Sequence, residues 1–307
     1  MSSKLVILIN VVMVINLAVN QASFGQPEAI KGIDIPEEIA PIVTSVATVD
    51  PQNTIDFVQR LPAGNDLVPI IIFVHGGHRY RSLENRTNAS LNNPTITRLL
   101  EAGFGIVLPS FRSYEQFEAN KVGPIDDVAA VLEALRSSPR VDPDSIIMMG
   151  HSSGGRMTLE IAARPDAPKV IIVSEPASTL LAELFPMPDP NVSREPFTPN
   201  LEIVANLEKY YTRDKQDIIE DKVQRISSPV LLIHSDIHQV NRANARILIP
   251  ALTKYKKLTK EINYPGYGHG YINGSGGITE DILEMFINDI VTFSSRYIST
   301  QPQPLSY

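Results

Sequence analysis

The sequence GHSSG at residues 150–154 places a serine between two glycines, the pattern G-x-S-x-G. Alone it is a weak signal, because glycine and serine are common in turns for conformational reasons. It indicates nucleophilic catalysis where a buried strand precedes it and a helix follows. Here the apolar run SIIMMGHS ends at Ser152 and the helical pattern GGRMTLEIAARP follows. We therefore interpret Ser152 as a nucleophile, with the Ser153 backbone N–H as first oxyanion donor; the alternative is a structural Gly/Ser turn.

A serine hydroxyl needs a base to become nucleophilic at neutral pH. His269 lies in YPGYGHGY, after the last strand expected from the sequence, and glycines on both sides leave its ring accessible. It also follows Ser152 in chain order, as the Ser…acid…His arrangement of strand-to-helix nucleophiles requires. We predict that His269 is the general base, although a loop histidine can also be merely solvated.

Two carboxylates are candidates for the acid that orients the base. Asp236 in LLIHSDIHQV follows the penultimate expected strand, where the Ser…Asp…His order places the acid. Glu175 in IVSEPAS follows the strand before it. Asp236 is the preferred candidate, with a turn-forming role as its alternative. Glu175 is the second candidate, and it could instead cap a helix or line the pocket.

The segment FVHGGHRYR supplies a second candidate oxyanion element. A Gly-Gly pair directly after a buried strand allows a backbone N–H to approach a ligand closely. The N–H of Gly77 or of His78 is therefore the expected second donor.

A metal site is the alternative chemistry. In HSDIH, the side chains of His234, Asp236 and His238 alternate, so an extended strand would point them to one face. Such a site would make the protein a metallohydrolase, but it would leave the serine turn and His269 unexplained. We expect no cofactor and no metal.

The elements that must position these residues are visible as short apolar runs separated by helical patterns. The runs lie at residues 68–77, 103–112, 145–152, 169–177, 229–236 and 260–266. Apolarity without alternation is typical of strands buried on both faces, and so of a mostly parallel sheet flanked by helices in an α/β fold. Two further β-rich runs surround the turn VDPQN and predict a hairpin. TEDILEMFINDIVTFSSRYI predicts a final amphipathic helix.

Four segments define the expected domain organisation. Residues 1–25 resemble a secretory signal peptide, because Lys4 precedes an apolar stretch that is too short to span a membrane. This leader predicts a secreted or periplasmic protein. Once the leader is removed, no stable membrane insertion is expected. Residues 26–307 are expected to form one domain. Within it, residues 178–228 are too long for an ordinary connection and predict a lid-like insertion before the penultimate strand. Residues 300–307 are expected to be a frayed tail.

Composition excludes several classes of function. The chain has 307 residues, a formal net charge of −7 and no cysteine. An acidic chain lacks the basic face that sequence-independent nucleic-acid binding needs. Without cysteine, a thiol nucleophile, a disulfide framework and a Cys-ligated zinc site are impossible.

Several motifs in order resemble a known family. The motifs are VHGG, IDDVAAVLEALRSSPRVDPDSIIMMGHSSGG, SSPVLLIHSD and YPGYGHGY. Over residues 50–295 the chain resembles the catalytic domain of the prolyl oligopeptidase group of α/β-hydrolases and its dienelactone-hydrolase-like relatives. The resemblance implies a serine hydrolase acting on a small-molecule ester or a short peptide, with Ser152 as nucleophile and His269 as base. The family usually places its acid about two residues after Asp236, near His238. A hydrolase-fold binding protein without activity is the remaining alternative.

Overall fold

The computed structural model describes most of the chain from residue 40 onward. The described residues are 40–48, 53–64, 66–77, 80–112, 123–184, 203–235, 238–269 and 278–304. The expected leader, His78 and Asp236 lie outside these ranges. The described residues belong to one compact unit.

The centre of the fold is a sheet in the order β1-β2-β4-β3-β5-β6-β7-β8. Its strands are β1 Ile42–Ala47, β2 Thr54–Arg60, β3 Val68–Val74, β4 Gly105–Pro109, β5 Val141–His151, β6 Val170–Ser174, β7 Val230–His234 and β8 Leu258–Asn263. The β1–β2 and β2–β4 pairs are antiparallel, and every later pair is parallel. The expected hairpin and the mostly parallel sheet are confirmed.

Burial on both faces explains why the central strands are apolar without alternation. In β3, Ile70 and Ile72 belong to one core cluster, whereas Ile71 and Phe73 belong to the other. Successive side chains of a strand point to opposite faces, so the two clusters lie on the two sides of the sheet. The two edge strands, β1 and β8, instead have largely alternating patterns of burial.

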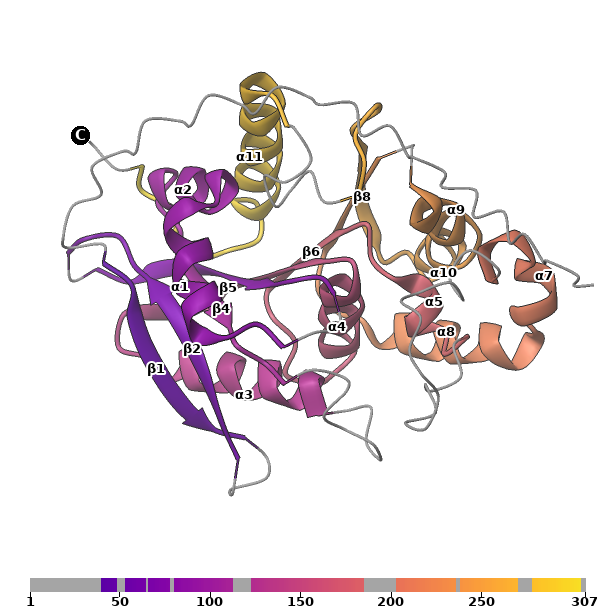
Figure 1. Cartoon of the computed structure of the whole chain (residues 1–307), viewed down its shortest axis with the longest axis horizontal. Coiled ribbons are helices and arrows are strands. Elements are labelled where there is room, and N and C mark those ends of the chain that lie inside the picture. The colour runs from indigo at the N-terminus through magenta and orange to yellow at the C-terminus, as the bar shows by residue number, and fades with distance from the viewer. Residues whose placement is uncertain are drawn as a thin grey trace, which may run out of the picture. The chain divides into compact units, whose positions relative to one another are not determined.

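Helices cover both faces of the sheet (Figure 1). They are α1 Leu83–Asn92, α2 Pro94–Glu101, α3 Gly123–Arg136, α4 Ser153–Ala162, α5 Ser178–Leu181, α7 Leu207–Tyr210, α8 Arg213–Arg225, α9 Gln239–Arg246, α10 Leu248–Lys254 and α11 Glu280–Ser294. The buried side chains of α3, α4, α8 and α10 belong to one cluster, and those of α2 and α11 to the other. The layers on the two sides hold the sheet rigid, with the carboxyl ends of its parallel strands facing one edge.

Parts of two segments make contacts with the rest of the domain. Within residues 178–228, α8 buries Ile219 and Val223 in the core and packs against α4 and α10, because its apolar residues share one stripe. This part belongs to the helical layer, and the lid-like role expected for residues 178–228 stays a prediction. The tail is anchored through residue 300, since the backbone N–H of Thr300 donates to Ser145 Oγ at 2.8 Å.

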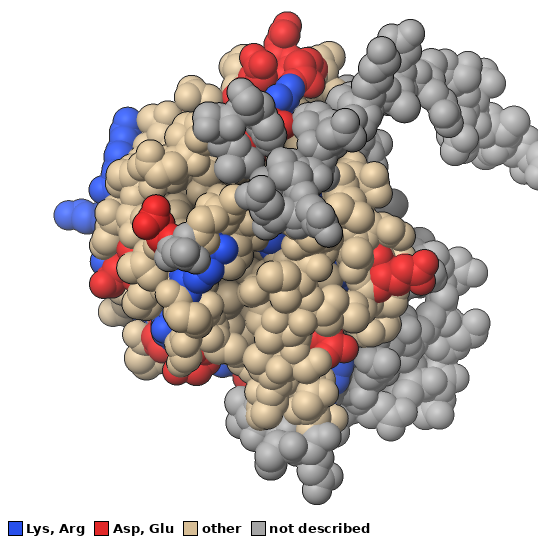
Figure 2. All heavy atoms as spheres, turned by 90° about the vertical axis from the view of Figure 1, so that its left-hand side faces the viewer, with Lys and Arg blue, Asp and Glu red and all other residues tan. Residues whose placement is uncertain are grey.

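One face of the molecule carries charged side chains of both signs (Figure 2). On the face shown in Figure 2, acidic and basic side chains both occur and are separated by broad areas of other residues. No helix in the described part of the chain combines the length and the apolar composition that crossing a membrane requires.

Candidate active site

Ser152 lies on a strained turn between β5 and α4. Its φ is 54° and its ψ is −118°, a backbone conformation that non-glycine residues rarely adopt. The neighbouring glycines make this turn possible. A Cβ on Gly150 would lie 2.3 Å from Thr158 Oγ1, and one on Gly154 would lie 2.2 Å from the Val74 carbonyl oxygen. The G-x-S-x-G pattern is therefore required by backbone packing around Ser152.

The loop after β3 lies directly against this turn. A Cβ on Gly76 would lie 3.0 Å from Ser152 Cβ. Gly77, with a φ of 87°, accepts a hydrogen bond of 2.7 Å from Ser153 Oγ. Because α4 begins at Ser153, unpaired N–H groups of its first turn lie beside the same loop. The structure thus brings two of the expected oxyanion residues, Ser153 and Gly77, together at Ser152, and the third, His78, lies outside the described residues.

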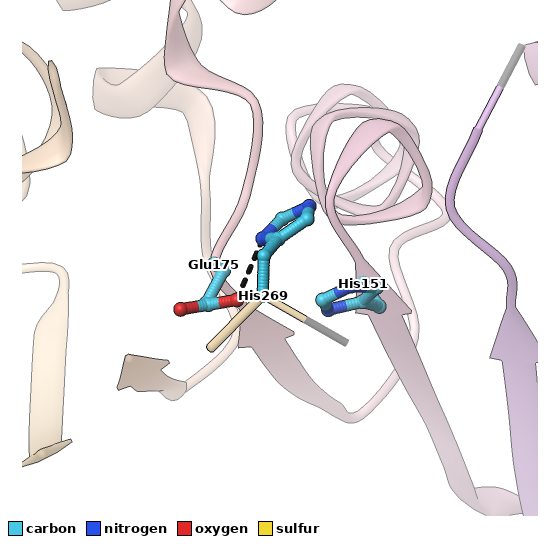
Figure 3. Close-up of side chains that lie close together, drawn as sticks. All are labelled: His151, Glu175 and His269. Atoms are coloured by element: carbon cyan, nitrogen blue, oxygen red, sulfur yellow. Dashed lines mark hydrogen bonds and ion pairs between the residues drawn. The ribbon is translucent and has the colours of Figure 1, made fainter. Parts of the chain in front are cut away.

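A buried carboxylate holds His269. The side chain of Glu175 is fully buried, and its Oε2 lies 2.6 Å from Nδ1 of His269 (Figure 3). Glu175 follows β6 and has a positive φ of 43°, and its backbone N–H donates to the Ile233 carbonyl beside β7. The His269 side chain keeps 24% of its surface exposed. A carboxylate accepts only, so Nδ1 carries the proton in this bond and Nε2 is left as an acceptor.

Further donors fix the other oxygen of Glu175. Its Oε1 accepts from Ser235 Oγ at 2.5 Å and from Asn241 Nδ2 at 3.2 Å. Burial, the strongest single influence, raises the pKa of Glu175, but hydrogen bonds from His269 and Ser235 together outweigh it, so that the pKa is lowered. Glu175 is therefore ionised at neutral pH although no solvent reaches its side chain.

The sequence ranked Asp236 above Glu175, yet the carboxylate bonded to His269 in the structure is Glu175. Asp236 itself lies outside the described residues. Which of the two carboxylates reaches His269 depends on how far β6 and β7 extend. It also depends on the direction in which the chain turns after each strand. The positive φ of Glu175 makes this turn, and the segment SEPAS carries no local signal for it.

The ring of His269 lies between two other histidines. Its centroid is 4.6 Å from that of His151, at the end of β5, and 4.2 Å from that of His238, which is stacked on it at 16°. Burial, with a smaller contribution from His269, lowers the pKa of His151 to about 3. The same two influences lower the pKa of His238. Sequence reasoning missed both contacts, because neither histidine is next to His269 in the chain.

The arrangement fits a hydrogen-bonded dyad better than a metal site. Ligand atoms of His151, Glu175 and His269 lie within 4.8 Å of one another. However, an ion there would have to replace hydrogen bonds that already satisfy both oxygens of Glu175. Two of the three metal ligands considered from the sequence, His234 and His238, have different partners. His234 Nε2 lies 3.0 Å from Glu261 Oε1, whereas His238 stacks on His269.

Comparisons with solved structures agree with this fold. A carboxyl esterase from the fungus Tuber melanosporum has a TM-score of 0.61 at 16% identity, over 87% of this chain and 89% of that one. A putative dipeptidyl aminopeptidase IV from Bacteroides ovatus has a TM-score of 0.62 at 16% identity, over 84% of this chain and 36% of that one. A puromycin-hydrolyzing peptidase from Mycobacterium tuberculosis has a TM-score of 0.57 at 18% identity, over 87% and 42%. The protein thus has the α/β-hydrolase fold.

The sequence comparisons identify the family. The fold defines the class first: a protein with the α/β-hydrolase fold. The model of the prolyl oligopeptidase family matches residues 112–288, more than half of the chain, and the chain belongs to this family. A curated relative, the uncharacterized protein YfhR of Escherichia coli K12, is 26% identical over 107 residues, and the match spans 34% of each of the two proteins.

Proposed function

We propose that the protein cleaves ester or peptide bonds through an acyl-enzyme, with Ser152 as nucleophile, His269 as base and Glu175 as the acid that orients the base. The 2.6 Å hydrogen bond between His269 and the fully buried Glu175 carries this proposal. It leaves Nε2 of His269 as an acceptor, which is the protonation state a general base needs.

The reaction follows from these groups. Ser152 Oγ attacks the carbonyl carbon while Nε2 of His269 accepts its proton. The positive charge on the imidazole is stabilised by Glu175, and the oxyanion is stabilised by N–H groups of Ser153 and of Gly77 or His78. His269 then protonates the leaving alcohol or amine. A water molecule, deprotonated by His269, releases the acid from Ser152.

The contacts around Ser152 support this mechanism. Among the described residues, Ser152 Oγ and His269 make no hydrogen bond to each other. Catalytic hydrogen bonds of unliganded hydrolases are often long and tighten only when substrate binds. A Cβ added to Gly76 would lie 3.0 Å from Ser152 Cβ, and Ser153 Oγ donates to the Gly77 carbonyl oxygen, so the loop after β3 lies close enough to support a preformed oxyanion site.

A fluorophosphonate probe tests the nucleophile. Such a probe phosphonylates an activated serine, so peptide mapping of the folded protein should find the adduct on Ser152, and Ser152→Ala should abolish both labelling and hydrolysis. An unlabelled Ser152 would favour the hydrolase-fold binding protein. Activity that survives Ser152→Ala but disappears with a chelator would favour a metallohydrolase. Ester and aminoacyl-amide substrates measured side by side would assign the bond that is cleaved.

Two matched variants test the acid. In Glu175→Gln, the new amide oxygen accepts the hydrogen bonds from Ser235 and Asn241. The amide NH₂ group then faces Nδ1 of His269. His269 then adopts the tautomer whose Nε2 carries a proton and accepts none, so kcat should fall by about a thousandfold or more. Asp236→Asn should leave kcat close to wild type. The opposite result would return the role to Asp236.

We also propose that the protein is secreted or periplasmic, on the evidence of the leader-like residues 1–25. Expression of the full chain followed by N-terminal sequencing of the exported protein tests this. A mature N-terminus after Ala22 or Gly25 would support export, and an intact Met1 in the cytoplasmic fraction alone would contradict it.

A further inference from the structure

His238 contacts the base directly. Its ring is stacked on His269, with centroids 4.2 Å apart and ring planes inclined by 16°. On the way to the transition state, the His269 ring must keep Nδ1 on Glu175 while Nε2 faces the serine. An aromatic surface against its face limits rotation of the ring out of that plane.

His238 also belongs to the framework that holds the acid. It is the N-cap of α9, and its Nδ1 accepts a hydrogen bond of 3.3 Å from the backbone N–H of Val240. In the first turn of the same helix, Asn241 donates to Oε1 of Glu175 at 3.2 Å and to the carbonyl oxygen of Ser235. The start of α9 therefore sets the position of a donor that fixes Glu175.

The cap requires a neutral ring. Nδ1 can accept from Val240 only when it carries no proton, so the proton of neutral His238 is on Nε2. This agrees with the lowered pKa of His238, which burial and the neighbouring His269 cause. His238 thus presents an uncharged aromatic face to His269 in the state where His269 must accept a proton and become positive.

We propose that His238 is a positioning residue that orients the base and the acid together: its ring packs on His269, and its cap on α9 places Asn241 at Glu175. The proposal rests on the proposed function, because it assumes that His269 and Glu175 act as base and acid. His238 takes no part in proton transfer. It occupies the region where the family resemblance places the acid, which in this chain comes instead from the loop after β6.

Three substitutions separate the two contacts. His238→Phe keeps an aromatic ring on His269 but removes the cap acceptor. His238→Asn keeps a good N-cap but removes the stacking. His238→Ala removes both and should lower kcat by about tenfold, with a smaller loss in each of the other two variants. KM should stay within about twofold of wild type, because substrate binding is unchanged.

A matched control lies on the same segment. His234 ends β7, and its Nε2 faces Glu261 on β8 rather than the triad. His234→Gln should therefore keep the kcat and KM of the wild type. Far-UV circular dichroism and urea unfolding at neutral pH identify any variant that fails to fold, and kinetics are compared only among folded variants, with His238→Asn and His238→Phe as the milder pair.

The outcomes are distinct from those that test the proposed function. Unchanged kcat in folded His238→Asn and His238→Phe would overturn the proposal. A raised KM with unchanged kcat would also overturn it, because His238 would then be a substrate contact. Failure of the fluorophosphonate to label Ser152 in the wild type would instead overturn the proposed function. Labelling of wild-type Ser152 together with slower labelling in His238→Ala would support both.

Discussion

Two buried histidines should make the fold sensitive to mild acid. Burial, followed by the nearby charge of Arg86, lowers the pKa of His75 to about 3 from its ordinary value of 6.5. Burial, followed by His269, lowers the pKa of His151 to about 3 as well. Both side chains are neutral in the folded protein, whereas in the unfolded chain each binds a proton as the pH falls below 6.5. The stability that they contribute is therefore present above pH 6.5 and is lost as the pH falls toward 3.

The size of the effect follows from these values. Between pH 7 and pH 5, each histidine should remove about 2 kcal/mol from the free energy of unfolding, and the two together about 4 kcal/mol. That is a large share of the roughly 5–15 kcal/mol that stabilises a typical domain. Carboxylates such as Glu175, whose pKa is lowered by its hydrogen bonds despite burial, lose their contribution only below the ordinary value of 4.5. The chosen pH range thus isolates the histidines.

Urea unfolding at pH 7, 6 and 5 measures the effect, followed by far-UV circular dichroism because the chain has no tryptophan. The matched variant is His75→Phe, which keeps the ring stacked on Phe111 at 4.2 Å but cannot titrate. Its loss of stability between pH 7 and pH 5 should be about 2 kcal/mol smaller than that of the wild type. A wild type whose unfolding free energy is flat over this range would refute the reasoning, as would an equal loss in the variant.

Two further predictions concern the framework around Ser152 and Glu175. Gly154→Ala places a Cβ 2.2 Å from the carbonyl oxygen of Val74, so it should lower the free energy of unfolding by about 1–3 kcal/mol and abolish fluorophosphonate labelling. Gly268→Ala, where a Cβ meets nothing within 4 Å, should unfold at the wild-type urea concentration. Ser235→Ala removes a hydroxyl donor to Glu175 and should lower kcat about tenfold without raising KM. A kcat equal to that of the wild type would show that Asn241 and the backbone N–H of residue 235 suffice for Oε1.

The central strands could be predicted from the sequence because a strand buried on both faces must be apolar throughout. The β5 strand shows the limit of this rule. The apolar run begins near Ser145, but the strand begins at Val141 and contains Pro143. Proline removes a ladder hydrogen bond, which argues against a strand. The sheet accommodates it because the β3–β5 register shifts between Val68 and Ile70.

The sequence could also predict where Ser152 and His269, the proposed nucleophile and base, would lie. Ser152 lies between glycines whose need for close backbone approach can be read from the sequence, and a Cβ added to Gly150 or Gly154 would make contacts shorter than 3 Å. His269 lies in YPGYGHGY, whose glycines indicate an accessible ring instead. The ring contacts of His238 and His151 with His269 have no such local pattern. They depend on the three-dimensional order of β5, β7 and β8 at the carboxyl edge of the sheet.

The acid could not be ranked from spacing, because spacing says only that both carboxylates follow neighbouring strands. The surroundings of Glu175 give the information that spacing does not. Glu175 is fully buried with donors on both oxygens, from His269 on one and from Ser235 and Asn241 on the other. A buried carboxylate with fewer donors would be costly and would take up a proton. Ser235 and Asn241, which both follow β7, supply the donors to Oε1. The segment that the sequence expected to provide the acid therefore donates hydrogen bonds to Glu175, a carboxylate that follows the neighbouring strand β6.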